Sequence, residues 1–232
     1  MRGSGPATIT CIVSVHHGAR FLAEALDSVF AQTLQPTEII LIDDGSTDDT
    51  AMVAAEHASC ISYIRQVNAA PAAARNIGLA LATGDFISFL DADDVWAPDK
   101  LERQVRVLET NPATGMCITH LQDAWVEELG EERARLGNAD LASLVPGLVQ
   151  CLVARRGVFE LVGRFDATKR LAADDDWLSR AERAGVIRET VSLPLVRRRI
   201  HVHSVTYQMY RRGKDRRVIP MDRTRRLNLT RG

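Results

Sequence analysis

The 232-residue chain lacks a long hydrophobic run and an amino-terminal targeting pattern. No stretch of about 18 apolar residues occurs, so the sequence predicts no membrane-spanning helix. The first residues hold one arginine and a short apolar segment that ends at His16 and His17, which is typical of neither a signal peptide nor a transit peptide. We therefore expect a cytoplasmic protein with one large domain or two small ones.

Phosphate-binding glycine loops are also missing. The sequence contains no GxxxxGK[ST] motif, and no GxGxxG motif follows its first apolar segment. These absences argue against a P-loop nucleoside triphosphatase and against an enzyme that uses NAD. A phosphate-bearing ligand, if there is one, must be held by other residues.

Cysteines are few, and none has metal-ligand spacing. The four are far apart in the chain: Cys11, Cys60, Cys117 and Cys151. Each lies in or beside an apolar segment, and no CxxC pair occurs. We expect buried free thiols in a reducing cytoplasm, and neither a disulfide framework nor a zinc site.

The formal net charge of −1 conceals a basic carboxyl-terminal end. Residues 197–232 hold twelve Lys or Arg and two Asp or Glu, so the remainder of the chain carries about −11. An acidic body makes nucleic acid an unexpected partner. We predict that the basic tail, residues 207–232, approaches the anionic inner face of a membrane or a lipid-diphosphate acceptor. The alternative is a solvated or disordered tail.

Short apolar runs alternate with helical patterns in the first half of the chain. Strands are expected at 8–15, 38–42, 61–64 and 85–90. Helical patterns are expected at 21–29 and 71–82, with a further helix capped by Ser46 or Thr47. This alternation favours a parallel, doubly wound α/β sheet.

The second half is less regular. Helices are expected at 99–108 and 175–184, and strands at 114–121, 148–153 and 196–203. The charged segment 123–140 is weakly patterned, and we expect it to be a mobile insertion. No linker or repeat interrupts the chain, so one domain is favoured.

Aspartates follow two of the four early strands. Asp43 and Asp44 follow the second strand, and Asp91, Asp93 and Asp94 follow the fourth. The carboxyl ends of strands border the ligand crevice in open α/β sheets. Because close carboxylates need a compensating cation, Asp91-Ala-Asp93 suits Mg²⁺ or Mn²⁺ shared with substrate phosphates. The alternative for both clusters is a set of solvated turn and capping residues.

Two later groups of residues also have both a functional and a structural interpretation. Asp174, Asp175 and Asp176 begin a helix, where they provide either a general base or charges favoured by the helix dipole. The expected last strand alternates so that Arg199, His201 and His203 share one face. That face suits a pyrophosphate or a metal, and otherwise belongs to a solvated edge strand.

Together these motifs resemble family 2 glycosyltransferases. The resemblance extends from about residue 8 to 206 and is carried by segments 40–48, 74–94 and 156–166, followed by the acidic cluster and Trp177-Leu-Ser-Arg180. It implies a GT-A fold for nucleotide-diphospho-sugar transfer, with a mainly parallel central sheet flanked by helices. The domain at 8–206 would divide into a nucleotide-sugar-binding half, 8–95, and an acceptor half, 96–206.

The resemblance also implies site residues. Asp43 or Asp44 would bond the nucleotide base, Arg75 would lie over the base or near its phosphates, and Asp91 would face the ribose. The implied nucleotide-sugar site comprises Ser14, His16, Asp43, Asp44, Arg75, Asp91, Ala92 and Asp93. The implied metal site comprises Asp91, Asp93 and His201.

The implied reaction is an inverting transfer from a nucleotide-diphospho-sugar, expected to be a UDP-sugar, to a glycan, lipid-linked or other hydroxyl acceptor. It would need Mn²⁺ or Mg²⁺ and would serve cell-envelope polysaccharide biosynthesis. Asp174 would be the catalytic base, with Asp175 as the alternative because Ala173 replaces the usual glutamate. His16-His17 stands where the family usually has Tyr-Asn.

Two other functions fit part of the sequence. The segment from Asp91 to Val95 also matches the DxDx[TV] pattern of haloacid-dehalogenase-like phosphatases, with Asp91 as nucleophile and Asp93 as general acid. That motif normally opens its fold, whereas here an α/β half precedes it. A nucleotide-binding module without catalysis is the third interpretation.

Overall fold

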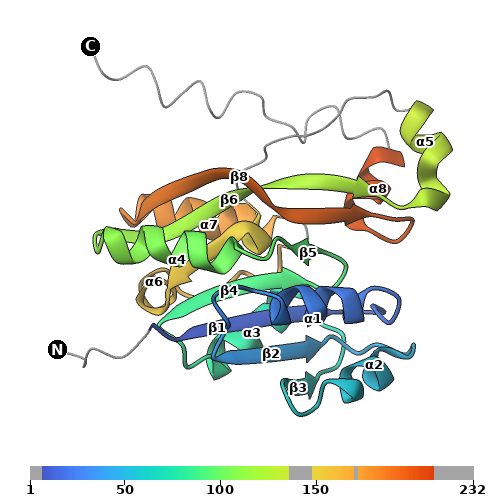
Figure 1. The fold of residues 1–232 in the computed structure, drawn as a ribbon, viewed down its shortest axis with the longest axis horizontal. Helices are drawn as coiled ribbons and strands as arrows, with labels where there is room; N and C mark the ends of the chain where they lie inside the picture. Colours follow the sequence, from blue (N-terminus) through green and yellow to red (C-terminus); the bar gives the residue numbers. More distant parts are fainter. Residues whose placement is uncertain (1–6, 136–147, 170–171, 212–232) are drawn as a thin grey trace.

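The computed structural model describes residues 7–135, 148–169 and 172–211. In this part of the chain eight strands form one sheet of order β3-β2-β1-β4-β7-β6-β8-β5 (Figure 1). The strands are β1 Ile9–Val15, β2 Glu38–Asp43, β3 Ser62–Arg65, β4 Phe86–Asp91, β5 Val95–Trp96, β6 Thr114–Trp125, β7 Leu152–Arg155 and β8 Ile187–Ile200. The α-helices are α1 Leu22–Phe30, α2 Thr50–Glu56, α3 Pro71–Leu81, α4 Lys100–Thr110, α5 Gly130–Arg135, α6 Arg156–Val162, α7 Ala173–Arg183 and α8 Val205–Arg211. Two short 3₁₀-helices are η1 Glu127–Leu129 and η2 Val149–Cys151.

The first half of the sheet is parallel, as the alternation predicts. β1 pairs in parallel with β2 and β4, and β2 pairs in parallel with β3. Alternate residues of these apolar strands enter cores on opposite faces: α1 and α4 cover one face, and α3, α6 and α7 cover the other (Figure 1). Gly78 lets α3 lie close to β1, since a Cβ there would meet the Ile12 side chain at 2.4 Å.

The second half makes the sheet mixed. β7 runs antiparallel to both β4 and β6, and β5 runs antiparallel to β8, whereas β6 and β8 are parallel. The predicted α/β architecture with flanking helices is therefore confirmed, but the later strands do not continue the doubly wound pattern. The expected strand at 148–153 is replaced by η2 followed by β7.

β8 differs most from its predicted bounds. It begins at Ile187 and accommodates Pro194 where its register with β6 shifts, because proline cannot donate to a regular ladder. It ends at Ile200, so His201 and His203 follow the strand and do not share one strand face with Arg199. That expected face is therefore wrong.

Three smaller expectations also need correction. The segment after Gln122 continues β6 to Trp125 and then forms η1 and α5, so its first part is regular structure. Cys60 is exposed in the turn before β3, whereas the other three cysteines are buried free thiols. The helix α2 begins after Asp49, and Asp48 accepts the Thr50 N–H, so neither Ser46 nor Thr47 caps it.

Most of the basic tail, residues 212–232, lies outside the described residues, and its membrane role stays a prediction. The part of the chain that is described contains no helix both long and apolar enough to cross a bilayer.

A lysine lies inside the core beneath β4. Lys100 is fully buried, its Nζ donates to Ser88 Oγ at 3.3 Å, and it lies 4.1 Å from the ring centroid of Trp96. Burial lowers the pKa of Lys100 to about 8, although the nearby Cys151 and Cys11 thiols act in the opposite direction. The fold thus contains a base that is costly to keep protonated.

This burial predicts that the contribution of Lys100 to stability increases with pH. Between pH 8 and the ordinary lysine pKa of 10.5, the unfolded chain binds the proton that the folded Lys100 has lost, so this contribution to the free energy of unfolding rises with pH. The buried thiols of Cys11, Cys117 and Cys151 act in the opposite direction above pH 9, because burial raises their pKa, so the comparison is made between variant and parent protein at each pH.

Lys100→Met removes the contribution of the lysine and should raise the unfolding free energy at pH 7 by about 3 kcal/mol. Urea unfolding of both proteins at pH 7 and pH 10 measures the difference. Lys169→Met, at a half-exposed site, is the control; equal effects of the two substitutions would contradict this account.

Candidate functional site

The carboxyl ends of β1, β2 and β4 border a cavity of about 1020 Å³. It contains the sequence-predicted site residues Ser14, His16, Asp44, Arg75, Asp91, Ala92, Asp93, Asp174, Asp175 and His201. Asp43 does not line it. The cavity therefore joins residues from both halves of the domain, which sequence spacing alone does not establish.

Asp43 lies beneath the cavity and holds the turn after β2. It is fully buried, and its carboxylate accepts the Ser46 N–H at 2.8 Å and the Tyr63 hydroxyl at 2.6 Å. Burial favours a higher pKa, but these hydrogen bonds and the nearby Arg65 outweigh it and hold the pKa of Asp43 below its usual value. Between the two aspartates of this motif, Asp44 is the one placed at the cavity wall.

Asp44 and His16 form one hydrogen-bonded unit at the ends of β2 and β1. Asp44 Oδ1 accepts from Gln66 Nε2 at 2.5 Å and from the Ala69 N–H at 2.8 Å. His16 Nδ1 lies 2.9 Å from the Asp44 carbonyl oxygen, which only accepts, so we assign the proton to Nδ1. His16 Nε2 is then free to accept from Asn68 Nδ2 at 3.1 Å.

Arg75 connects three elements around the cavity. It is 6% exposed, and its guanidinium donates to Asp91 Oδ1 at 2.8 Å and to Asp174 Oδ1 at 2.6 Å. Burial opposes the charge of Arg75, but the two carboxylates outweigh it and raise its pKa. The guanidinium thus lies between two carboxylates, and α3, β4 and α7 are joined by one cation.

The three aspartates at the start of α7 have different surroundings. Burial raises the pKa of Asp174, and the charge of Arg75 opposes this rise. Asp175 is exposed and also lines the cavity. Asp176 is paired with Lys169 and Arg180, so only this third residue fits the alternative of a structural charge at the helix start.

Asp93 faces His201 across the cavity wall. Asp93 Oδ2 lies 3.0 Å from His201 Nε2, and the His201 ring packs 4.9 Å from the ring of Phe21. The described residues include no group of three or more His, Cys, Asp or Glu side chains arranged to hold a metal alone. An oxygen and a nitrogen about 3 Å apart nevertheless match neighbouring ligands of one octahedral cation, which takes its other ligands from water and substrate phosphates. Burial and the charges of Asp93 and Asp91 raise the pKa of Asp94, and a cation here would offset the repulsion among these carboxylates.

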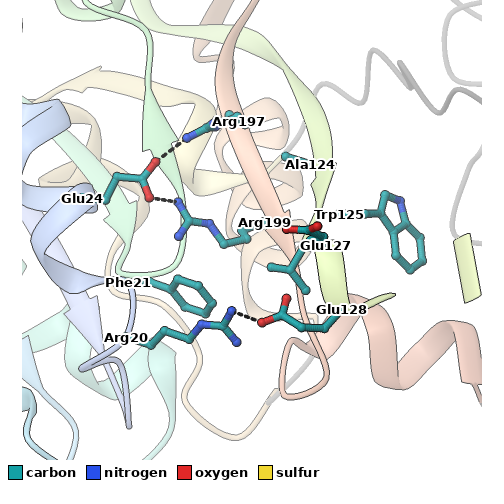
Figure 2. A pocket seen from close by; sticks show the side chains of 10 residues that line it. Arg20, Phe21, Glu24, Ala124, Trp125, Glu127, Glu128, Arg197 and Arg199 are labelled. Atoms are coloured by element: carbon teal, nitrogen blue, oxygen red, sulfur yellow. Dashed lines mark hydrogen bonds and ion pairs between the residues drawn. The ribbon is translucent and has the colours of Figure 1, made fainter. Parts of the chain in front are cut away.

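A second cavity of about 520 Å³ lies between α1 and the ends of β6 and β8 (Figure 2). Figure 2 shows Glu24 paired with both Arg197 and Arg199; the Arg199 Nη2 to Glu24 Oε2 distance is 2.7 Å. The Arg199 guanidinium lies 4.4 Å over the ring of Phe21, and both residues line the main cavity as well as this one. Arg199, His201 and His203 thus all line the main cavity, although they do not share a strand face, and their contact with a pyrophosphate stays a prediction.

Sequence reasoning missed several residues of the main cavity, among them Phe21, Asn68 and Gln150. Asn68 follows β3, so the same argument from strand ends that selected the aspartates was available for it. Phe21 resembles any apolar residue of an amphipathic helix, and Gln150 lies in an irregular segment. Neither carries a sequence signal that points to a cavity.

Comparisons with known proteins bear on the family and on the fold. The family model for glycosyl transferase family 2 matches residues 10–152. An uncharacterized glycosyltransferase of Nostoc is 38% identical over 184 residues, which are 72% of this chain and 56% of the relative. The succinoglycan biosynthesis protein ExoW of Rhizobium meliloti is 38% identical over 181 residues, 66% of this chain and 56% of that protein. The chain thus spans a little over half the length of these relatives.

Solved structures share the fold at low sequence identity. The fragment 1–349 of S. aureus TarS in complex with UDP-GlcNAc has a TM-score of 0.69 and 18% identity, covering 85% of this chain and 60% of that fragment. The mannosyltransferase PcManGT of Pyrobaculum calidifontis, in complex with GDP-Man and Mn²⁺, has a TM-score of 0.68 and 22% identity, covering 91% and 62%. The expected GT-A fold is confirmed by these similarities.

The bridge made by Arg75 predicts a large stability effect. Arg75→Met leaves Asp91 and Asp174 facing each other without a counterion, so the free energy of unfolding should fall by about 3 kcal/mol or more. Arg106→Met is the matched control, because Arg106 pairs with Glu102 on an exposed helix surface and should cost less than about 1 kcal/mol. Chemical denaturation of both variants measures the two costs. Equal losses would show that the buried bridge has no special role.

Proposed function

The chain belongs to glycosyltransferase family 2, and we propose that it transfers a sugar from a nucleotide-diphospho-sugar to an acceptor hydroxyl group with inversion at the anomeric carbon. One observation carries this proposal: a single cavity contains the ends of β1, β2 and β4 and the first turn of α7. The strand ends supply groups for a nucleotide and a cation, and α7 supplies carboxylates for proton removal. The phosphatase interpretation receives no comparable support.

The nucleoside is proposed to bind at β1 and β2. Asp44 and His16 offer a carboxylate and an imidazole ring to the base, and Ser14 and Asp91 lie on the adjacent strands for the ribose. We favour a uridine nucleotide, as the family resemblance implies. The solved TarS and PcManGT complexes hold UDP-GlcNAc and GDP-Man, so uracil and guanine are the two bases to compare.

Asp93 and His201 are the residues proposed to hold Mn²⁺ or Mg²⁺. A divalent cation held by these two residues would neutralise the charge that develops on the leaving diphosphate, without proton transfer. The 3.0 Å spacing of the two side chains supports this assignment, and Asp91 is held nearby by Arg75. The PcManGT complex contains Mn²⁺, which supports the choice of metal.

Asp174 is proposed as the catalytic base. Its ionised carboxylate removes the proton of the acceptor hydroxyl while that oxygen bonds to the anomeric carbon, and the bond from this carbon to the diphosphate oxygen breaks. Attack opposite to the leaving group inverts the anomeric centre. Arg75 favours the ionised form of Asp174 and fixes one of its oxygens. Asp175, on the same turn and exposed, is the alternative base.

The acceptor is proposed to be a glycan or a lipid-linked glycan in polysaccharide biosynthesis. ExoW, the relative from Rhizobium meliloti, is named for succinoglycan biosynthesis, which supports this class of acceptor. We place the reaction in the cytoplasm, at or near the inner face of the membrane. A nucleotide-binding role without transfer is the alternative, and the substitutions below separate the two.

Nucleotide-sugar binding should depend on the metal and on Asp93. Calorimetry with UDP- and GDP-sugars, with and without Mn²⁺, should show binding that Mn²⁺ strengthens. Asp93→Ala should weaken the metal-dependent part about tenfold or more, because it removes one of two protein ligands. Asp27→Ala on α1, away from the cavity, is the control. Absence of binding by every donor, or full retention of the Mn²⁺ effect in Asp93→Ala, would refute the donor site.

Substitution of the proposed base should lower the rate of transfer and leave donor binding nearly unchanged. Asp174→Asn keeps an oxygen for Arg75 but cannot take a proton, so transfer should fall at least a hundredfold while donor affinity changes only a few-fold. Steady-state rates and calorimetry measure the two effects. Asp175→Asn is the matched comparison and should retain most of the activity. The reverse pattern would move the role to Asp175, and unchanged turnover in both would refute a base on α7. Donor binding without any turnover in the parent protein would leave a binding module.

A further inference from the structure

The turn between β4 and β5 is fixed at both of its corners. The Asp94 N–H donates to the Asp91 carbonyl oxygen at 2.9 Å, which closes the turn. The Asp91 side chain at the first corner is held by Arg75 and by Ser14 Oγ, at 2.8 and 3.2 Å. Ala92 and Asp93 therefore occupy the two central positions, and the orientation of Asp93 depends on how the second corner is held.

The Asp94 side chain connects the second corner of this turn to β8. Asp94 is 2% exposed, and its Oδ1 accepts the backbone N–H of Arg199 at 3.0 Å. Oδ2 accepts from Gln150 Nε2 at 3.3 Å. A buried carboxylate is costly unless donors satisfy it, and both of these donors come from elements distant in sequence. Asp94 thus connects the turn to two distant parts of the chain, which an ordinary turn residue does not do.

The contact lies where the ladder between β5 and β8 ends. Val95 pairs with Arg197 and Trp96 pairs with Val196, and no backbone pair continues the ladder toward the end of β8. The Asp94 carboxylate binds the next available N–H of β8, two residues before His201. Beyond it, His201 is held by its own N–H to Ser204 Oγ and by packing on Phe21.

We propose that Asp94 is a positioning residue: by fixing the Asp91–Asp94 turn to the end of β8, it sets the separation between Asp93 and His201. The inference rests on the proposed function, because that pair is the proposed cation site. Outer residues that orient ligands in this way change metal affinity about 10–100-fold when removed. The Asp94 carboxylate acts here as a hydrogen-bond acceptor, so a neutral side chain of the same shape should replace it.

Asparagine provides that test. In Asp94→Asn, Oδ1 still accepts the Arg199 N–H, and Nδ2 can donate to the Gln150 side-chain carbonyl oxygen once the Gln150 amide turns over. That oxygen has no hydrogen-bond partner among the described residues. Asp94→Ala removes both contacts. Glu189→Ala is the matched control, because Glu189 is a half-buried carboxylate on β8 that also accepts two hydrogen bonds and does not line the cavity. Circular dichroism establishes that each variant is folded.

The first measurement needs neither metal nor nucleotide. In ¹H–¹³C spectra of the full chain, with the His201 imidazole signal assigned by its loss in His201→Gln, Asp94→Ala should move the signal toward its position in Asp93→Ala. Asp94→Asn and Glu189→Ala should leave it unmoved. An unmoved signal in Asp94→Ala, an equal shift in Asp94→Asn, or an equal shift in Glu189→Ala would each overturn the inference.

The second measurement is Mn²⁺ affinity in the presence of UDP, read from the paramagnetic resonance of free Mn²⁺. Asp94→Ala should weaken binding at least tenfold, and Asp94→Asn should stay within about threefold of the parent protein. Equal loss in both variants would show a role of charge and overturn positioning. If the parent protein binds no Mn²⁺ with UDP while the histidine signals behave as expected, the proposed function fails and the positioning role stands.

Discussion

The structure of the cavity depends on one buried cation that compensates the negative charges gathered around it. Asp91 and Asp174 come from opposite halves of the domain, and both contact the buried guanidinium of Arg75. Without that cation the two carboxylates would repel each other in a partly desolvated site. With it, β4 and α7 are held at one wall of the cavity, so the proposed ribose contact and the proposed base are fixed relative to each other. This is the preorganisation that a displacement reaction needs, because the reacting groups must be aligned before the reaction.

The aspartate pairs near the ends of β2 and β4 differ in how their side chains are held. Asp43 and Asp94 are buried, and each accepts a hydrogen bond from an element distant in the sequence. Asp44 lines the cavity, but it is 4% exposed and its Oδ1 accepts two hydrogen bonds. Among these four aspartates, Asp93 is the one whose side chain is not buried.

Much of this site could be predicted from the sequence, for physical reasons. A buried strand followed by aspartates places them at the sheet edge whatever the rest of the chain does, so Asp44, Asp91 and Asp93 were found correctly as cavity residues. The direction of long side chains could not be predicted. Arg199 turns to Glu24, which is 175 positions away, and the alternation of its strand carries no information about that partner. Likewise, β8 extends nine residues earlier than expected because its pairing with β6 tolerates a register shift near Pro194.

The central claim is that one cavity aligns a donor with a carboxylate base for a single displacement. The stereochemistry of slow donor hydrolysis, with water in place of the acceptor, tests it most directly. Proton NMR of the anomeric signal should show the β-sugar appearing first from a UDP-α-sugar in the presence of Mn²⁺. First appearance of the α-sugar would require retention through a second displacement or a different geometry, and would contradict the account.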